Sequence, residues 1–156
     1  MTQAAFRPVI SRATLADLDT LAGLFDAYRV FYRQPSDTAC ARAFIEERLR
    51  RDESVIFLAR ASEGDKAIGF TQLYPAFSSV SAGRIWILND LFVTATARQH
   101  GVARALMARA RAFAAETHAL RLVLETAADN RPAQALYESL GYVAETGTRH
   151  YSLALG

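Results

Sequence analysis

Between Arg84 and Val93 the chain is apolar almost throughout, and a short polar loop then leads into an amphipathic stretch. A run that is continuously apolar rather than alternating is typical of a strand covered on both faces. From Gly101 to about Thr117, apolar residues recur at three- and four-residue steps, which predicts a helix with one buried face. A buried strand followed at once by a helix predicts an α/β architecture.

The other elements follow from similar patterns. Thr14 suits an N-cap, with Asp17 in the first turn, and the following helix ends before Pro35. A hairpin-type connection at residues 63–66 predicts antiparallel pairing of the strands on either side. The predicted strands cover residues 6–13, 55–61, 67–74, 84–93 and 120–126, and the predicted helices cover 14–34, 37–51, 101–117 and 132–140, with a final hairpin after Gly141.

This order of elements predicts an α/β (α+β) fold, in which a mixed sheet carries helices on both faces. We see no repeat, linker or low-complexity stretch, so residues 1–156 are expected to form a single domain. At 156 residues, such a domain can bury a large core without a disulfide or metal.

Composition narrows the environment and the partners. Hydrophobic residues make up 51% of the chain, but no apolar run approaches the roughly 20 residues of a membrane span. No secretory signal is visible, and the single cysteine, Cys40, agrees with a reducing cytoplasm. The net charge is +2 and the arginines are dispersed, so we expect neither a nucleic-acid nor a membrane partner.

The loop before the third long helix has the outline of an anion site. Unpaired amides at a helix N-terminus stabilise phosphate oxygens, and Gly101 allows close approach of the backbone. Arg98 and Arg104 add positive charge. A plain strand-to-helix turn remains the alternative from this loop alone. The chain lacks both the P-loop pattern and the G-x-G-x-x-G of dinucleotide sites.

Two motifs together carry a family resemblance. Arg98-x-x-Gly101-x-Ala103 resembles the pyrophosphate signature of the GCN5-related N-acetyltransferase (GNAT) superfamily, [Gln/Arg]-x-x-Gly-x-[Gly/Ala]. The segment from Asn130 to Tyr142 is similar to that family's N-x-x-A-x-x-L-Y-x-x-x-G-F motif. The element order also matches along the whole chain. The resemblance implies a mostly antiparallel sheet splayed in a V, and acetyl-CoA as co-substrate.

The resemblance also assigns cofactor-binding positions. The pantetheine arm would lie in the V against the main chain of the first splayed strand, and the pyrophosphate would lie on the loop and helix N-terminus. Asn130 would contact the arm or cap its helix. The residues so implied are Leu91, Phe92, Val93, Arg98, Gln99, His100, Gly101, Val102, Ala103, Arg104, Asn130 and Tyr137.

Acetyl transfer to an amine needs a proton acceptor and a proton donor. Tyr137 matches the motif tyrosine that lies near the cofactor sulfur in the family, so the resemblance makes it the acid. Asp90 and Glu125 lie on the two strands expected to flank the V, and either is a candidate base. Polyamine acetyltransferases carry a glutamate where this chain has Asn89, which cannot take a proton and is expected to orient substrate.

The expected acceptor is a primary amine of a small molecule. The segments around Tyr28 and Asn89 resemble a subgroup that includes fungal histone and D-amino-acid acetyltransferases, and more distantly polyamine acetyltransferases. Tyr28, Tyr32 and Tyr74 are candidate acceptor contacts, although aromatic residues at helical spacing also suit a core.

Other functions stay open beside this one. A protein or peptide amino group is an alternative acceptor, and a non-catalytic acyl-CoA-binding regulator is another reading. The histidines have no metal-type spacing, so no metal is expected. The resemblance implies a homodimer.

Overall fold

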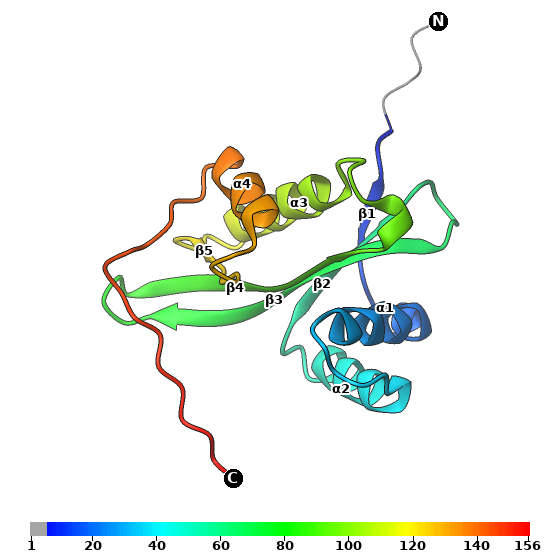
Figure 1. Ribbon diagram of the computed structural model, residues 1–156, viewed down its shortest axis with the longest axis horizontal. Helices are drawn as coiled ribbons and strands as arrows, with labels where there is room; N and C mark the ends of the chain where they lie inside the picture. The colour runs from blue at the N-terminus through cyan, green and yellow to red at the C-terminus, as the bar shows by residue number, and fades with distance from the viewer. Residues whose placement is uncertain (1–5) are drawn as a thin grey trace, which may run out of the picture. The chain divides into compact units, whose positions relative to one another are not determined.

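The computed structural model describes residues 6–156, which divide into two compact units, one up to Leu124 and one from Glu125 to Gly156. The first unit is built on a five-stranded sheet in the order β1-β2-β3-β4-β5 (Figure 1). The strands are β1 (Val9–Arg12), β2 (Val55–Arg60), β3 (Ala67–Ser78), β4 (Gly83–Val93) and β5 (Leu122–Val123). Only the β4–β5 pair is parallel among these strands, so the predicted mixed, mostly antiparallel sheet is confirmed.

Helices cover both faces of this sheet, as predicted (Figure 1). On one face α1 (Leu18–Phe31) packs against α2 (Thr38–Arg50), and on the other face lies α3 (Val102–Glu116). Short 3-10 turns, η1 (Leu15–Asp17) and η2 (Ala95–Ala97), precede α1 and follow β4. Within residues 6–156, none of the helices has the length and apolar character that crossing a bilayer requires.

Local signals explain where the helices begin. Thr14 Oγ1 accepts a hydrogen bond from the Ala16 amide at 3.2 Å, and Asp17 Oδ2 accepts one from the Thr14 amide at 2.9 Å. This reciprocal pair is a capping box, so the predicted N-cap is confirmed. Asp37 caps α2 by accepting from the Cys40 amide at 2.9 Å.

The apolar stripes of the helices form the two halves of the core. On the α3 face, every residue of the predicted stripe is buried: Val102, Leu106, Met107, Ala110, Phe113 and Ala114. On the opposite face, Leu21 of α1 and Ile45 of α2 are fully buried in one cluster with Phe70 of β3. The apolar stripe of α1 is no longer buried at the C-terminal end of the helix, where Tyr32 is 54% exposed. The C-terminal end of α1 therefore presents aromatic surface.

The pairing of β4 with β3 is irregular at one position. Gln72 of β3 pairs with Asp90, but the next residue of β3 pairs with Leu88. Asn89 is therefore the extra residue of a β-bulge. On the other edge of β4, the pairing with β5 ends at Ile87 within the part of the chain that the structure describes. The rest of β4 runs along an open edge.

The second unit holds α4 (Arg131–Ser139), for which Asn130 is the N-cap. No strand follows α4 in the described chain up to Gly156, so the predicted final hairpin is wrong. The predicted strand over residues 120–126 is likewise reduced to β5. A strand needs a partner for its ladder hydrogen bonds, and residue types along the chain do not by themselves supply one.

Candidate functional site

Asp90 is the centre of the candidate site. It is only 2% exposed, although carboxylates are rarely buried without a cation. Asn89 Nδ2 donates to Asp90 Oδ1 at 2.8 Å, and Gln72 Nε2 donates to Asp90 Oδ2. The Tyr28 hydroxyl, on α1, interacts with the same carboxylate. Neutral donors from β4, β3 and α1 thus hold the carboxylate, and within residues 6–156 no ion pair neutralises it.

Burial shifts the titration of this group. Desolvation raises the pKa of Asp90 above its ordinary 3.8, and the hydrogen bonds from Asn89, Gln72 and Tyr28 offset part of that rise. Burial, together with the nearby charge of Asp90, also raises the pKa of Tyr28, and it raises the pKa of Tyr74 to about 12. The two phenols therefore stay protonated at neutral pH, and the carboxyl is closer to the range of a proton acceptor.

Aromatic rings gather around Tyr28, whose phenol interacts with this carboxylate. The ring centroids of Tyr28 and Tyr32 are 4.9 Å apart, and Phe31 lies 5.2 Å from Tyr32 and 6.4 Å from Phe92. Phe31 and Tyr32 are both more than half exposed. Because ring faces attract cations, exposed rings beside a buried carboxylate suit an ammonium group. The structure brings together these predicted acceptor residues: Tyr28, Tyr32, Tyr74 and Asn89.

The open edge of β4 offers main-chain groups. The Thr94 amide donates to the carbonyl of Ile68 at 2.9 Å, across the β3–β4 ladder. Since hydrogen-bonding groups alternate in direction along an antiparallel strand, the amides and carbonyls of Leu91 and Val93 face the open edge. The Val93 carbonyl confirms this direction by accepting from Arg98 Nε at 3.1 Å. Leu91 and Val93, two of the residues predicted to contact the pantetheine arm, therefore direct their main-chain groups toward the open edge of β4.

The predicted pyrophosphate loop has an unusual backbone. Gln99 and Gly101 adopt positive φ angles of 64° and 76°. A Cβ placed on Gly101 would meet no heavy atom within 4 Å, so its outer side is open. Gly101 is the N-cap of α3 and makes no side-chain cap. The helix thus begins beside an exposed glycine and without a side-chain cap on its first amides, although Val102 itself is buried, and a helix N-terminus of this kind suits a phosphate group.

Arg98 connects this loop to α1. Its guanidinium lies 5.4 Å from the ring centroid of Phe31 and 6.0 Å from that of Phe92, while its Nε is bonded to the Val93 carbonyl. The sequence predicts only that its charge serves an anion. His100 in the same loop makes an edge contact with Phe6 at 6.0 Å.

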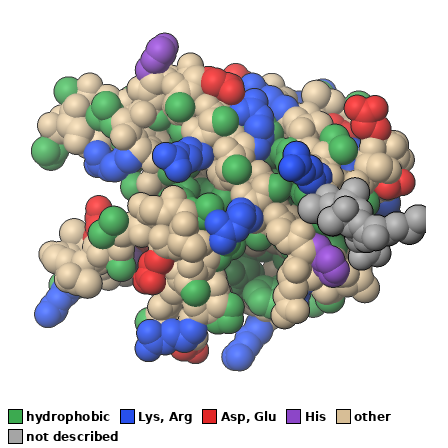
Figure 2. Space-filling model, turned by 90° about the horizontal axis from the view of Figure 1, so that it is seen from above, with side chains coloured by type: hydrophobic (Ala, Val, Ile, Leu, Met, Phe, Trp, Pro, Cys, Tyr) green, Lys and Arg blue, Asp and Glu red, His purple; other side chains and the backbone are tan. Residues whose placement is uncertain are grey.

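Positive charge is not concentrated in one large patch on the face that Figure 2 shows. Lys and Arg side chains lie there at separate places, among hydrophobic and uncharged groups, as their spread along the sequence leads one to expect. Attraction of an anionic group to the predicted loop would therefore depend on local groups, the helix amides and the nearby arginines.

Three predicted residues belong to the second unit. Asn130 Oδ1 accepts from the Ala133 amide at 3.4 Å, which confirms its capping role. Tyr137 lies on α4, with its ring centroid 6.1 Å from that of Tyr142. Glu125 is an exposed residue whose carboxylate lies 3.4 Å from His150 Nδ1. Their predicted roles in binding and catalysis stay predictions.

Gln72 is a part of the site that the sequence prediction omits. It is fully buried, and it contacts the Asp90 carboxylate directly. One signal was available, since Thr71 and Gln72 are adjacent polar residues in the middle of an otherwise apolar strand. Buried polar residues in such a position need partners, but the sequence does not identify them.

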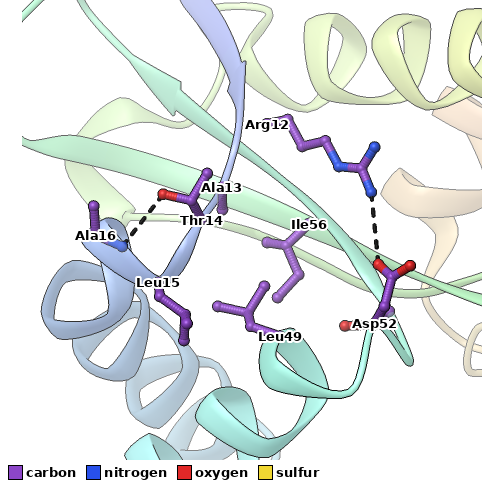
Figure 3. Close-up of a pocket in the computed structure, with 9 residues that line it drawn as sticks. Arg12, Ala13, Thr14, Leu15, Ala16, Leu49, Asp52 and Ile56 are labelled. Carbon is purple, nitrogen blue, oxygen red and sulfur yellow. Dashed lines mark hydrogen bonds and ion pairs between the residues drawn. The ribbon is translucent and has the colours of Figure 1, made fainter.

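A pocket of about 410 Å³ lies elsewhere in the first unit, where β1 and η1 meet the end of α2 (Figure 3). Leu15, Leu49 and Ile56 give it apolar walls, and Arg12 and Asp52 approach each other at its side. Its lining residues are Arg12, Ala13, Thr14, Leu15, Ala16, Leu49, Asp52, Ser54 and Ile56. The predicted cofactor and acceptor residues are not among them.

Comparison with known proteins identifies the family of the chain. Residues 21–142 match the acetyltransferase (GNAT) family. An uncharacterised N-acetyltransferase of Bacillus subtilis (strain 168) is 49% identical over 92% of this chain and 95% of its own. A probable acetyltransferase of Haemophilus influenzae is 36% identical over 89% of this chain and 92% of its own. The crystal structure of a probable acetyltransferase, 48% identical, superposes with a TM-score of 0.89 over 95% of this chain and 98% of its own.

The chain therefore belongs to the acetyltransferase (GNAT) family. It is an N-acetyltransferase of the acetyl-CoA-dependent kind, as the two sequence motifs predict. The relatives' names do not specify the acceptor amine, and they do not name the fungal histone, D-amino-acid or polyamine subgroup. In the part of the chain that the structure describes, no group of three or more His, Cys, Asp and Glu side chains is placed to hold a metal ion.

Proposed function

We propose that this enzyme transfers the acetyl group of acetyl-CoA directly to a primary amine of a small molecule, such as an amino acid or a polyamine, in a ternary complex. The observation that carries the acceptor class is the buried Asp90 carboxylate, which has neutral partners and lies beside exposed aromatic rings. A buried charge without a counter-ion is costly, and an ammonium group would compensate it.

The residues around the loop fit the co-substrate. Gly101 leaves its outer side open, and the amides of Val102 and Ala103 begin α3 without a side-chain cap at the helix N-terminus. The open edge of β4 offers the Leu91 and Val93 main chain to the pantetheine arm. When bound there, acetyl-CoA supplies the activated acetyl group and a thiolate leaving group.

Particular residues of the chain then carry out the steps of the reaction. Asp90 binds the acceptor ammonium and takes its proton, directly or through a water molecule, so that the neutral amine can attack. The Val93 amide faces the open edge and stabilises negative charge that develops on the acetyl oxygen. Tyr137 gives its phenolic proton to the leaving thiolate. Glu125 remains the alternative base, but its side chain is 81% exposed, whereas Asp90 is buried.

Two measurements test this proposal: the effect of acetyl-CoA on the Tm of the protein, and the turnover of candidate amines. Acetyl-CoA is expected to raise the Tm, and a panel of amino acids, polyamines, aminosugars and short peptides is then assayed for release of free thiol. We expect turnover with at least one small primary amine. The Tyr137→Phe variant should lose most of that rate while acetyl-CoA still raises its Tm.

Two alternatives are decided by the same panel. Turnover on peptides alone would replace the small-molecule acceptor with a protein or peptide amino group. Binding of acetyl-CoA without turnover on any amine would favour a non-catalytic acyl-CoA-binding protein. The exposed rings of Phe31 and Tyr32, which are linked to the buried carboxylate through Tyr28, favour a compact cationic acceptor over either alternative.

A further inference from the structure

The buried amide of Gln72 is only half satisfied. Its Nε2 donates to Asp90 Oδ2, but its Oε1 is buried and has no hydrogen-bond partner. A buried acceptor without a partner is unfavourable, and a methionine of similar size would avoid that cost. Only the Nε2 donor of the amide is used, so its hydrogen bond to Asp90 explains why an amide stands at this position.

The surroundings of Asp90 make this donor important. Asn89 is exposed at the bulge, so its hydrogen bond to Asp90 competes with water. Gln72 is fully buried, where a hydrogen bond to a charged group is stronger because water does not compete. Gln72 and Asp90 also pair directly across β3 and β4, beside the bulge.

We propose that Gln72 is a positioning residue, which fixes the orientation of the Asp90 carboxylate and keeps it free of a proton for the acceptor amine. The role rests on the proposed function of Asp90. Gln72 Nε2 engages Oδ2 and Asn89 engages Oδ1, and each carboxylate oxygen accepts more than one hydrogen bond. Acceptor capacity is therefore left for an ammonium group while the carboxylate stays held in one orientation.

The groups that influence this titration come from each element around Asp90. Tyr28 on α1 donates a hydrogen bond, and Tyr74 on β3 interacts with the carboxylate charge. Arg48 on α2 acts on Tyr74. In a Gln72 variant all of these groups remain, so a changed titration of Asp90 reports the lost amide.

The first test measures the Asp90 titration directly. In ¹³C-labelled protein, the Asp90 side-chain carboxyl signal is assigned by its loss in Asp90→Asn and followed against pH. Gln72→Met removes the donor at similar volume, and we expect the pKa of Asp90 to rise by about one to two pH units. Thr71→Val is the matched control, because Thr71 Oγ1 donates only to the Asp90 main-chain carbonyl. It should lower the Tm and leave the titration unchanged.

The second test uses the rate. The acid limb of kcat/KM for acetyl transfer should move to higher pH in Gln72→Met by the same amount as the titration. Gln72→Glu keeps the shape of the side chain and serves if Gln72→Met does not fold. Its carboxyl contacts Asp90 and the pair shares a proton, so the acid limb should again move to higher pH.

Two results separate this proposal from the function on which it rests. Identical Asp90 titrations in wild type and in the folded Gln72 variants would overturn the positioning role, whatever the turnover. A raised Asp90 titration in these variants, without turnover on any amine by the wild type, would support the positioning role and contradict the proposed function.

Discussion

At the scale of single residues, this protein places an uncompensated carboxylate inside its first unit. Asp90 is held by an amide from β3, an amide from β4 and a phenol from α1. Such an arrangement lowers stability and is explained by use, because a general base is more effective when its pKa approaches the working pH. Replacing Asp90 with a neutral residue should therefore raise the stability of the fold and lower the activity.

Replacing Asp90 with asparagine tests this opposition. Because the folded-state pKa is raised, ionised Asp90 weakens the fold as pH rises through that pKa, and the penalty is absent below the ordinary value of 3.8. The buried Gln72 amide can turn so that its free carbonyl accepts from the side-chain amide that the substitution introduces. Asp90→Asn should thus raise the Tm at pH 7 and above, with little change near pH 3, while kcat falls about 10²- to 10⁴-fold. Thermal unfolding and steady-state rates across pH measure both effects, and an unchanged kcat would contradict the assigned role.

Asp26 provides the opposite case. Asp26 Oδ2 accepts from Ser36 Oγ at 2.6 Å and Oδ1 accepts from the Asp37 amide at 2.7 Å, which holds the loop between α1 and α2. These bonds lower the pKa of Asp26, so its contribution to stability is present above the ordinary value and is lost as pH falls through the folded-state value. Asp26→Asn should lower the Tm at pH 7, and the difference should shrink below pH 3.8. A Tm difference between wild type and Asp26→Asn that grows as the pH falls would contradict the stabilising role of ionised Asp26.

At the scale of elements, the join between β4 and α3 is the proposed co-substrate site. Its distinguishing feature is the left-handed Gly101 at the open start of α3. A side chain at this position costs backbone strain of about 1–2 kcal/mol and obstructs the approach of a phosphate.

Gly101→Ala separates these two effects when it is compared with Gly64→Ala. Gly64 has a similar φ of 81° and equally open surroundings, but it lies in the β2–β3 connection. Both variants should lose similar stability. Only Gly101→Ala should weaken acetyl-CoA binding, by about tenfold, which corresponds to the loss of one hydrogen bond to a charged group. Calorimetry measures the Kd of acetyl-CoA for both variants. Equal Kd values would show that Gly101 is not part of the acetyl-CoA site.

Prediction from sequence succeeded where the signal is local. The six-residue stripe of α3 and the cap at Thr14 depend on spacing within one element, and the structure confirms both. The sequence gives no signal, or a misleading one, where the outcome depends on pairing with distant residues. The bulge at Asn89 depends on the β3–β4 register, and the contact of Arg98 with Phe31 joins a loop to a helix far away in the chain. The predicted last hairpin had the right residue types but lacks strand partners in the described chain.

At the scale of the whole molecule, the C-terminal segment leaves apolar side chains uncovered. Tyr151, Leu153 and Leu155 alternate along it, and each is more than 80% exposed. Exposed apolar residues in series are typical of a surface that another chain covers. They support the homodimer that the family resemblance implies.

Light scattering tests the homodimer. We expect the wild-type protein to have twice the mass of one chain at micromolar concentration, and Leu153→Glu with Leu155→Glu to shift it towards the monomer. Val80→Glu is the control, since Val80 is fully exposed at the β3–β4 turn. A monomeric wild type, or a dimer that the double variant leaves intact, would contradict this prediction.

In the proposed reaction, this chain moves an acetyl group onto an amine that Asp90 receives. The most direct measurement is the stoichiometry of products, with free thiol and acetylated amine quantified together by mass spectrometry in wild type and Asp90→Asn. We predict one acetylated amine for each thiol released by the wild type, and loss of both products in Asp90→Asn. Thiol release without acetylated amine, or equal product formation by the variant, would contradict the claim.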